Sequence, residues 1–99
     1  MLFALICTDK PGSLAVRKSN RPEHVAYLQG LGDALVFAGP FTGEDGETPN
    51  GSLVVIEAAS RQAAETIAAA DPYAKAGLFA SVEIRPWIWV FNQPKPESA

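Results

Sequence analysis

Apolar residues gather in four short runs along this chain, and each run is rich in β-branched and aromatic side chains. The runs cover residues 2–8, 34–41, 52–57 and 81–91. Runs of this kind, bounded by Gly, Pro, Asn and Asp, are typical of β-strands. Between the first and second runs, and between the third and fourth, apolar residues recur every three or four positions, which is the spacing of a helix face. The pattern predicts the order β-α-β-β-α-β.

The first helix is predicted over residues 20–32. Asn20 and Glu23 have the spacing of a capping box, in which each side chain bonds the other residue's backbone. Pro22 would then fall in the first turn, where the missing N–H costs nothing. This placement makes the proline part of the start of the helix.

The second helix is predicted over residues 60–70, with Ser60 as its N-cap. Pro72 restricts the backbone of Asp71 and so ends the helix. Asp71 is then the N-cap of a further helical turn, which stops at Gly77. An aspartate in that position needs no catalytic role.

This element order is that of a ferredoxin-like α+β domain built from two βαβ halves. Residues 42–50 are acidic and dense in turn formers, so they are predicted to be a solvated and mobile hairpin loop. We expect one domain over residues 1–91. Residues 92–99 show no periodicity and are predicted to be a flexible tail.

Both faces of the predicted sheet carry apolar side chains, although helices cover only one face in this fold. The first strand is apolar on both sides. The last run places Trp87, Trp89 and Phe91 on the side away from the helices. A twofold homodimer that pairs sheet against sheet would cover this surface. The alternative is that the last strand bends and buries its tryptophans within the same chain.

Composition narrows the class of protein. The chain has 47% hydrophobic and 19% charged residues, as folded proteins do. A net charge of −3 argues against nucleic acid as a partner. No apolar stretch approaches the roughly 20 residues of a membrane span, and the short apolar start lacks the basic residues of a signal peptide. Cys7 is the only cysteine and forms no internal disulfide, which fits a cytoplasmic protein.

His24 is the only histidine, the residue type that exchanges protons near neutral pH. It borders the stripe that Leu28 and Leu31 form on the first helix, and Arg21 lies one turn earlier. Arg17 would join them if the helix extended back past the proline. Such a row could bind a carboxylate through the guanidinium fork. The alternative is a solvated basic helix face with an incidental histidine.

Other chemistry is poorly supported by the sequence. No second His or Cys has metal-ligand spacing, no glycine-rich loop suits a phosphate, and no serine lies in a nucleophile elbow. We therefore expect no metal and no cofactor. Ser52 is explained by its place where the chain returns from a hairpin loop, although its hydroxyl could donate a hydrogen bond into a cleft.

Several short motifs together resemble the YciI-like (YCII-related) family in order and spacing. They are Asp9-Lys10, Ser13-Leu14, Arg17, Arg21-Pro22-Glu23-His24, Ala38-Gly39-Pro40, Gly51-Ser52, Asp71-Pro72-Tyr73 and Ala76-Gly77. The resemblance covers nearly the whole chain. It implies a dimeric α+β barrel with a cleft centred on a histidine and an aspartate, which correspond here to His24 and Asp71.

The resemblance also implies a class of reaction, because the family is similar in fold to muconolactone isomerases and includes a dehydrochlorinase of a chlorinated hydroxyhydroquinone. The leading hypothesis is a cofactor-independent lyase or isomerase that moves a proton on a small anionic or aromatic organic acid. The expected catalytic pair is His24 and Asp71, and the expected substrate-binding residues are Arg17, Arg21, Ser52 and Tyr73. The alternative is a non-catalytic ligand-binding or interaction module of the same fold. An RNA-binding role is a distant third hypothesis.

Overall fold

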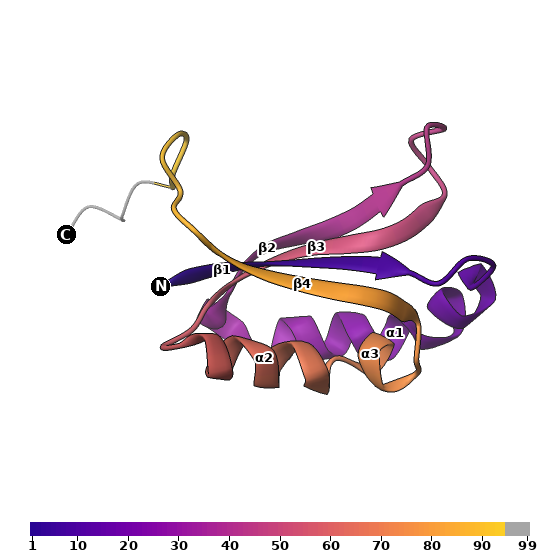
Figure 1. The fold of residues 1–99 in the computed structure, drawn as a ribbon, viewed down its shortest axis with the longest axis horizontal. Coiled ribbons are helices and arrows are strands. Elements are labelled where there is room, and N and C mark those ends of the chain that lie inside the picture. The colour runs from indigo at the N-terminus through magenta and orange to yellow at the C-terminus, as the bar shows by residue number, and fades with distance from the viewer. Residues whose placement is uncertain (95–99) are drawn as a thin grey trace.

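The computed structural model describes residues 1–94 as one antiparallel sheet with helices on one face (Figure 1). The elements are β1 (Leu2–Asp9), α1 (Leu14–Gly30), the 3₁₀ turn η1 (Gly32–Ala34), β2 (Leu35–Thr42), β3 (Pro49–Glu57), α2 (Arg61–Ala70), α3 (Pro72–Lys75) and β4 (Phe79–Trp87). The strand order is β2-β3-β1-β4, and all neighbours are antiparallel. This is the ferredoxin-like α+β topology, so the fold prediction is confirmed.

The core lies between the sheet and the helices. Alternate residues of the two central strands point toward the helices because side chains of a strand alternate between faces. The buried cluster consists of Phe3, Leu5, Cys7, Val54, Ile56, Ala58 and Ala64. Burial of these apolar side chains is the main force that holds α2 against the sheet.

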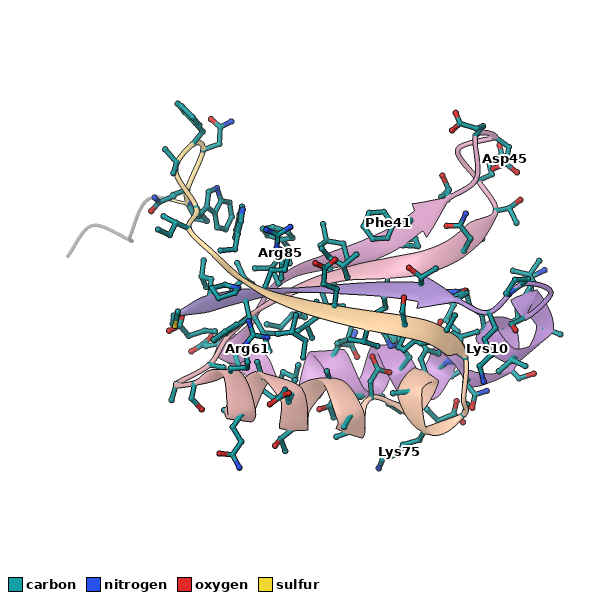
Figure 2. All side chains as sticks on the ribbon, in the orientation of Figure 1. Lys10, Phe41, Asp45, Arg61, Lys75 and Arg85 are labelled. Atoms are coloured by element: carbon teal, nitrogen blue, oxygen red, sulfur yellow. The ribbon has the colours of Figure 1, made fainter. Side chains whose placement is uncertain are left out.

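Within residues 1–94 no helix covers the opposite face of the sheet (Figure 2). Phe37 meets Trp87 and Trp89 edge to face, with ring centroids 5.7 and 5.2 Å apart. Figure 2 shows Phe41 and Arg85 on this same face. The tryptophans contact an aromatic side chain of their own chain, but neither is buried, and Trp87 keeps 36% of its surface exposed.

The prediction for the first helix was wrong at its start. The helix α1 begins at Leu14 rather than at residue 20, and Pro22 lies inside it. Asn20 does not cap the helix; its side-chain amide donates to the Val16 carbonyl at 2.9 Å. An internal proline costs a helix about 3 kcal/mol. The first turns persist because Arg17 is anchored by contacts outside the helix, described below.

The prediction for the last strand was wrong at both ends. The strand β4 runs from Phe79 to Trp87 instead of over residues 81–91. Trp87 pairs with Leu2, the first residue of β1, so the chain beyond it has no neighbouring strand to bond. Phe91 is 81% exposed beyond this point. Pro86 is tolerated because β4 is an edge strand.

The loop between β2 and β3 is shorter than predicted, because β2 extends to Thr42 and β3 begins at Pro49. Asp45 organises its tip (Figure 2). The Asp45 carboxylate accepts hydrogen bonds from the Thr48 hydroxyl and from the backbone N–H groups of Glu47 and Thr48. The Thr48 hydroxyl bond and these backbone bonds lower the pKa of Asp45 to about 2.

The second helix and the following turn match their predictions closely. The Ser60 hydroxyl caps α2 by accepting from the Ala63 N–H at 3.1 Å. Asp71 caps α3 by accepting from the Tyr73 N–H at 2.9 Å. The predicted tail lies partly outside the described residues, and 92–94 belong to no helix or strand. Within residues 1–94 no helix is long and apolar enough to cross a membrane.

Candidate active site

A buried histidine and aspartate meet under the sheet. His24 comes from α1 and Asp71 from the start of α3, and they are 9% and 7% exposed. The His24 Nδ1 lies 2.8 Å from Oδ1 and 2.9 Å from Oδ2 of Asp71. A carboxylate only accepts hydrogen bonds, so Nδ1 is the donor. The other ring nitrogen, Nε2, is then the one that can accept a proton.

The Asp71 carboxylate has two functions at once. Its Oδ1 accepts from the Tyr73 backbone N–H as well as from His24. The capping bond orients the carboxylate, and the carboxylate in turn orients the imidazole. Capping alone therefore does not account for Asp71, because the same side chain also binds the single histidine of the chain.

Tyr73 forms one wall of the site. Its ring stacks on the His24 ring with centroids 3.9 Å apart and planes 14° from parallel. It is 1% exposed. Burial raises the pKa of the Tyr73 hydroxyl, and the positive charges of Arg17 and Arg21 partly oppose this rise. The stack fixes the plane of the imidazole, which the hydrogen bond to Asp71 alone does not.

Arg17 is buried and paired with a carboxylate of its own chain. Its Nε donates to Asp9 Oδ2 at 2.7 Å, and its Nη2 donates to Asp9 Oδ1 at 2.9 Å. The same Nη2 donates to Ser52 Oγ at 3.0 Å, and the guanidinium carbon lies 4.7 Å from the centroid of the Tyr73 ring. Burial works to lower the pKa of Arg17, but the hydrogen bond and charge of Asp9 outweigh it, so this pKa lies above its ordinary value.

These residues border a cleft of ≈ 340 Å³ between α1 and the β2–β3 hairpin, a size that suits a small ligand. The apolar part of its lining includes Leu14, Val25, Leu28, Ala38, Pro40 and Val54. The polar part includes Arg17, Lys18, Arg21, His24, Ser52 and Tyr73. Arg21 and Lys18 are exposed at this cleft. Apolar walls with convergent cationic groups suit a flat organic anion.

All six site residues predicted from the sequence are brought together. His24, Arg17, Arg21, Ser52 and Tyr73 line the cleft, and Asp71 lies behind His24. The sequence interpretation gave no role to Asp9, although Asp9 was part of a recognised motif. Its position at the end of β1, after an otherwise apolar strand, was the available signal.

Gly51 keeps β1 and β3 close together beside the site. A Cβ atom at Gly51 would lie 2.5 Å from the Cys7 carbonyl oxygen, which is closer than real contacts allow. Any side chain there would push the strands apart.

The family model that matches this sequence is the YCII-related domain, over residues 1–88. The chain belongs to the YCII-related family. Protein YciI of Escherichia coli is 41% identical over 98 residues, which cover 92% of this chain and 100% of the relative. An uncharacterized protein of Haemophilus influenzae is 36% identical over 98 residues, which cover 92% of this chain and 100% of that relative.

Solved structures extend this family assignment. The 5-chloro-2-hydroxyhydroquinone dehydrochlorinase of Burkholderia phenoliruptrix, in complex with 2,5-dihydroxybenzoquinone, has a TM-score of 0.81 and 38% identity, covering 89% of this chain and 94% of that one. A NIPSNAP family protein of Agrobacterium tumefaciens has a TM-score of 0.56 and 19% identity, covering 94% and 95%. The second likeness shows the fold alone. The first shows that a protein similar to this YCII-related chain is an enzyme with a small-molecule ligand.

Proposed function

We propose that this YCII-related protein is a lyase or isomerase that uses His24 and Asp71 to move a proton on a small anionic organic ring. The observation that carries the proposal is the buried Nδ1 bond of His24 to Asp71, at 2.8 Å, on a cleft that His24 lines. In this arrangement Nε2 takes a proton from the ligand. The Asp71 carboxylate then stabilises the imidazolium that forms.

The electron pair released by proton removal decides between the two reaction types. In an isomerase the pair moves along the conjugated system, and His24 returns the proton to another carbon. In a lyase a proton is first moved from a ring hydroxyl to the carbon that carries the leaving group, and a second hydroxyl then loses its proton as the electron pair expels that group. Loss of one proton and one chloride from a chlorinated hydroxyhydroquinone leaves a quinone, so the overall change needs no oxidant. The similar dehydrochlorinase supports this class of substrate.

The ligand charge is proposed to be bound at the mouth of the cleft. The hydroxyl groups of 2,5-dihydroxybenzoquinone are vinylogous acids, so this ring is an anion at neutral pH. Arg21 is exposed at the cleft and takes part in no ion pair among the described residues. Its guanidinium can bind a pair of ligand oxygens through two N–H groups. The apolar lining would contact the faces of the ring.

The test is hydrogen exchange in heavy water. The purified protein is incubated with 2,5-dihydroxybenzoquinone, and deuterium at the ring carbons is followed by mass spectrometry against a protein-free control. Chloride release from 5-chloro-2-hydroxyhydroquinone is measured in parallel. Faster exchange or chloride release supports the enzyme. Binding of the quinone without either activity favours the alternative, a ligand-binding module.

The open face of the sheet is proposed to bind a second copy of the chain. It carries the aromatic cluster of Phe37, Trp87 and Trp89, and further exposed apolar residues follow β4 in the sequence. Glu83 and Arg85 give the same strand charges of both signs, with 3.9 Å between Arg85 Nε and Glu83 Oε2. A surface with both signs can pair with itself across a twofold axis.

Trp87→Glu is expected to weaken this dimer about 100-fold or more, because each copy would bury an unpaired charge. Sedimentation over a range of concentrations measures the change. Val16→Glu is the matched control, since Val16 is 37% exposed on α1 and Trp87 is 36% exposed on the sheet. A folded wild-type monomer at high micromolar concentration would contradict the dimer.

A further inference from the structure

Arg17 lines the cleft but brings no net charge to it. The Nε–H and both Nη2 hydrogens are directed to Asp9 and Ser52. The side chains of Arg17 and Asp9 are each 6% exposed, so the two opposite charges cancel inside the protein. Lys18 and Arg21, by contrast, are exposed at the cleft. The net positive charge at the cleft therefore comes from these two residues.

Ser52 has a hydrogen that is not used within residues 1–94. Its hydroxyl oxygen accepts from Arg17 Nη2 at 3.0 Å, and among the described residues no hydrogen bond is donated by this hydroxyl. Ser52 is 3% exposed and lines the cleft. A hydroxyl has one proton and two lone pairs. Because Arg17 can only donate, the Ser52 proton is left free to bond an oxygen in the cleft.

We propose that Ser52 donates a hydrogen bond to an oxygen of the bound ligand, and that Asp9 and Arg17 are positioning residues that set the direction of this bond. This inference rests on the proposed function, since it concerns the same cleft. It requires a ligand with at least two oxygens. One accepts from Ser52, and another faces the positive charge of Arg21.

Arg17 of this positioning pair also contacts Tyr73, the neighbour of His24 in the site. Arg17 lies over the ring of Tyr73, with 4.7 Å from its guanidinium carbon to the ring centroid. Tyr73 in turn stacks on His24 at 3.9 Å. A cation over an aromatic face is attracted to the ring, so Arg17 holds Tyr73 against the imidazole. Through the side chain of Arg17, Asp9 therefore influences both the Ser52 hydroxyl and the stacking of Tyr73 on His24.

The test compares binding of 2,5-dihydroxybenzoquinone by calorimetry at two salt concentrations. Ser52→Ala is expected to weaken binding about 2- to 12-fold without changing the salt dependence, because one hydrogen bond is lost and no charge. Arg21→Gln should weaken binding and also reduce the salt dependence, since salt screens charge interactions. Lys75→Gln, which removes an exposed cation that does not line the cleft, is the matched control.

The decisive variant is the double replacement Asp9→Asn/Arg17→Gln, which removes both buried charges together and avoids leaving one unpaired. It is expected to weaken binding at least as much as Ser52→Ala, with the salt dependence unchanged. Adding Ser52→Ala to it should then have little further effect. If the double variant loses salt dependence while Ser52→Ala binds like wild type, Arg17 binds the anion directly and the proposal is overturned.

NMR of the unliganded protein separates this inference from the proposed function. The ring protons of His24 carry a ring-current shift from Tyr73, which the Asp9→Asn/Arg17→Gln variant is expected to change and Ser52→Ala is not. Unchanged His24 signals in the double variant would overturn the positioning role. If wild-type protein does not bind the quinone, the proposed ligand class and the Ser52 contact fail. The His24 signals would still decide the role of Arg17.

Discussion

Replacing His24 with glutamine is expected to lower the rate of ring-proton exchange by about 10²- to 10⁴-fold, the usual contribution of a general acid or base. Glutamine has no nitrogen that accepts a proton near neutral pH. Its amide N–H can still donate to Asp71, so the variant leaves no buried carboxylate without a partner. The loss is measured in the heavy-water assay and compared with the stability of the variant in urea.

Asp71→Asn is expected to reduce the rate by a similar factor without loss of the α3 cap. Asparagine caps a helix about as well as aspartate does, but it has no charge to stabilise an imidazolium. Asp33→Asn is the matched control, because Asp33 is exposed in η1 and does not line the cleft. This control should retain the wild-type rate.

The double variant His24→Gln/Asp71→Asn tests whether the two residues act as one unit. Residues that act together have strongly non-additive effects on rate. The double variant should therefore be about as slow as His24→Gln alone. A wild-type rate in His24→Gln would reject the mechanism. Multiplied effects in the double variant would show that Asp71 acts independently of His24.

The Cys7 thiol is expected to react about 10³-fold more slowly with iodoacetamide at pH 8 in the folded protein than in urea. Burial, together with the nearby negative charge of Asp71, raises the pKa of Cys7 from 9.0 to about 12. Each pKa unit is a tenfold change in the thiolate fraction, and the thiolate is the reactive form. Ser19→Cys in a Cys7→Ala background supplies an exposed cysteine on α1, whose rate should differ little between the two states.

The raised pKa of Cys7 also predicts how stability changes with pH. The folded state holds this proton more tightly than the unfolded state does. Its contribution is therefore complete below pH 9.0 and is lost as pH rises toward about 12. Between pH 8 and 10.5 wild type should lose about 2 kcal/mol more than Cys7→Ala, as measured by urea unfolding. An equal loss of stability in both proteins, or equal alkylation rates in folded and unfolded wild type, would contradict the raised pKa of Cys7.

Local patterns were enough to predict the order of the elements. The alternation and β-branched content of the strands, the Ser60 cap and the Asp71-Pro72 boundary are all signals that act within a few residues. The pairing of His24 with Asp71, by contrast, was implied only by the resemblance to the YCII-related family. The strand, cap and boundary signals depend on neighbours in sequence, so the chain alone contains that information.

The errors in element bounds arose where distant residues outweigh local preference. Pro22 favours a helix start, but Arg17 is held by Asp9 and Ser52, so the earlier turns remain helical. The last apolar run favours a longer strand. It ends at Trp87 because β1 offers no partner beyond Leu2. A strand needs a neighbour to satisfy its backbone, and apolar content alone does not supply one.

The candidate active site shows the same division between local sequence signals and contacts of distant residues. The sequence by itself determined which residue types are present, that His24 and Arg21 share a helix face, and that Asp71 starts a turn. Only the tertiary structure decided that Asp9 neutralises Arg17, that the Ser52 hydroxyl donates no hydrogen bond within residues 1–94 and that Tyr73 stacks on His24. Ser52 is 35 residues from Arg17, and Asp71 is 47 residues from His24. Hydrogen bonds and stacking act over a few ångströms, so these partners are set by how the sheet and helices pack and not by any pattern along the chain.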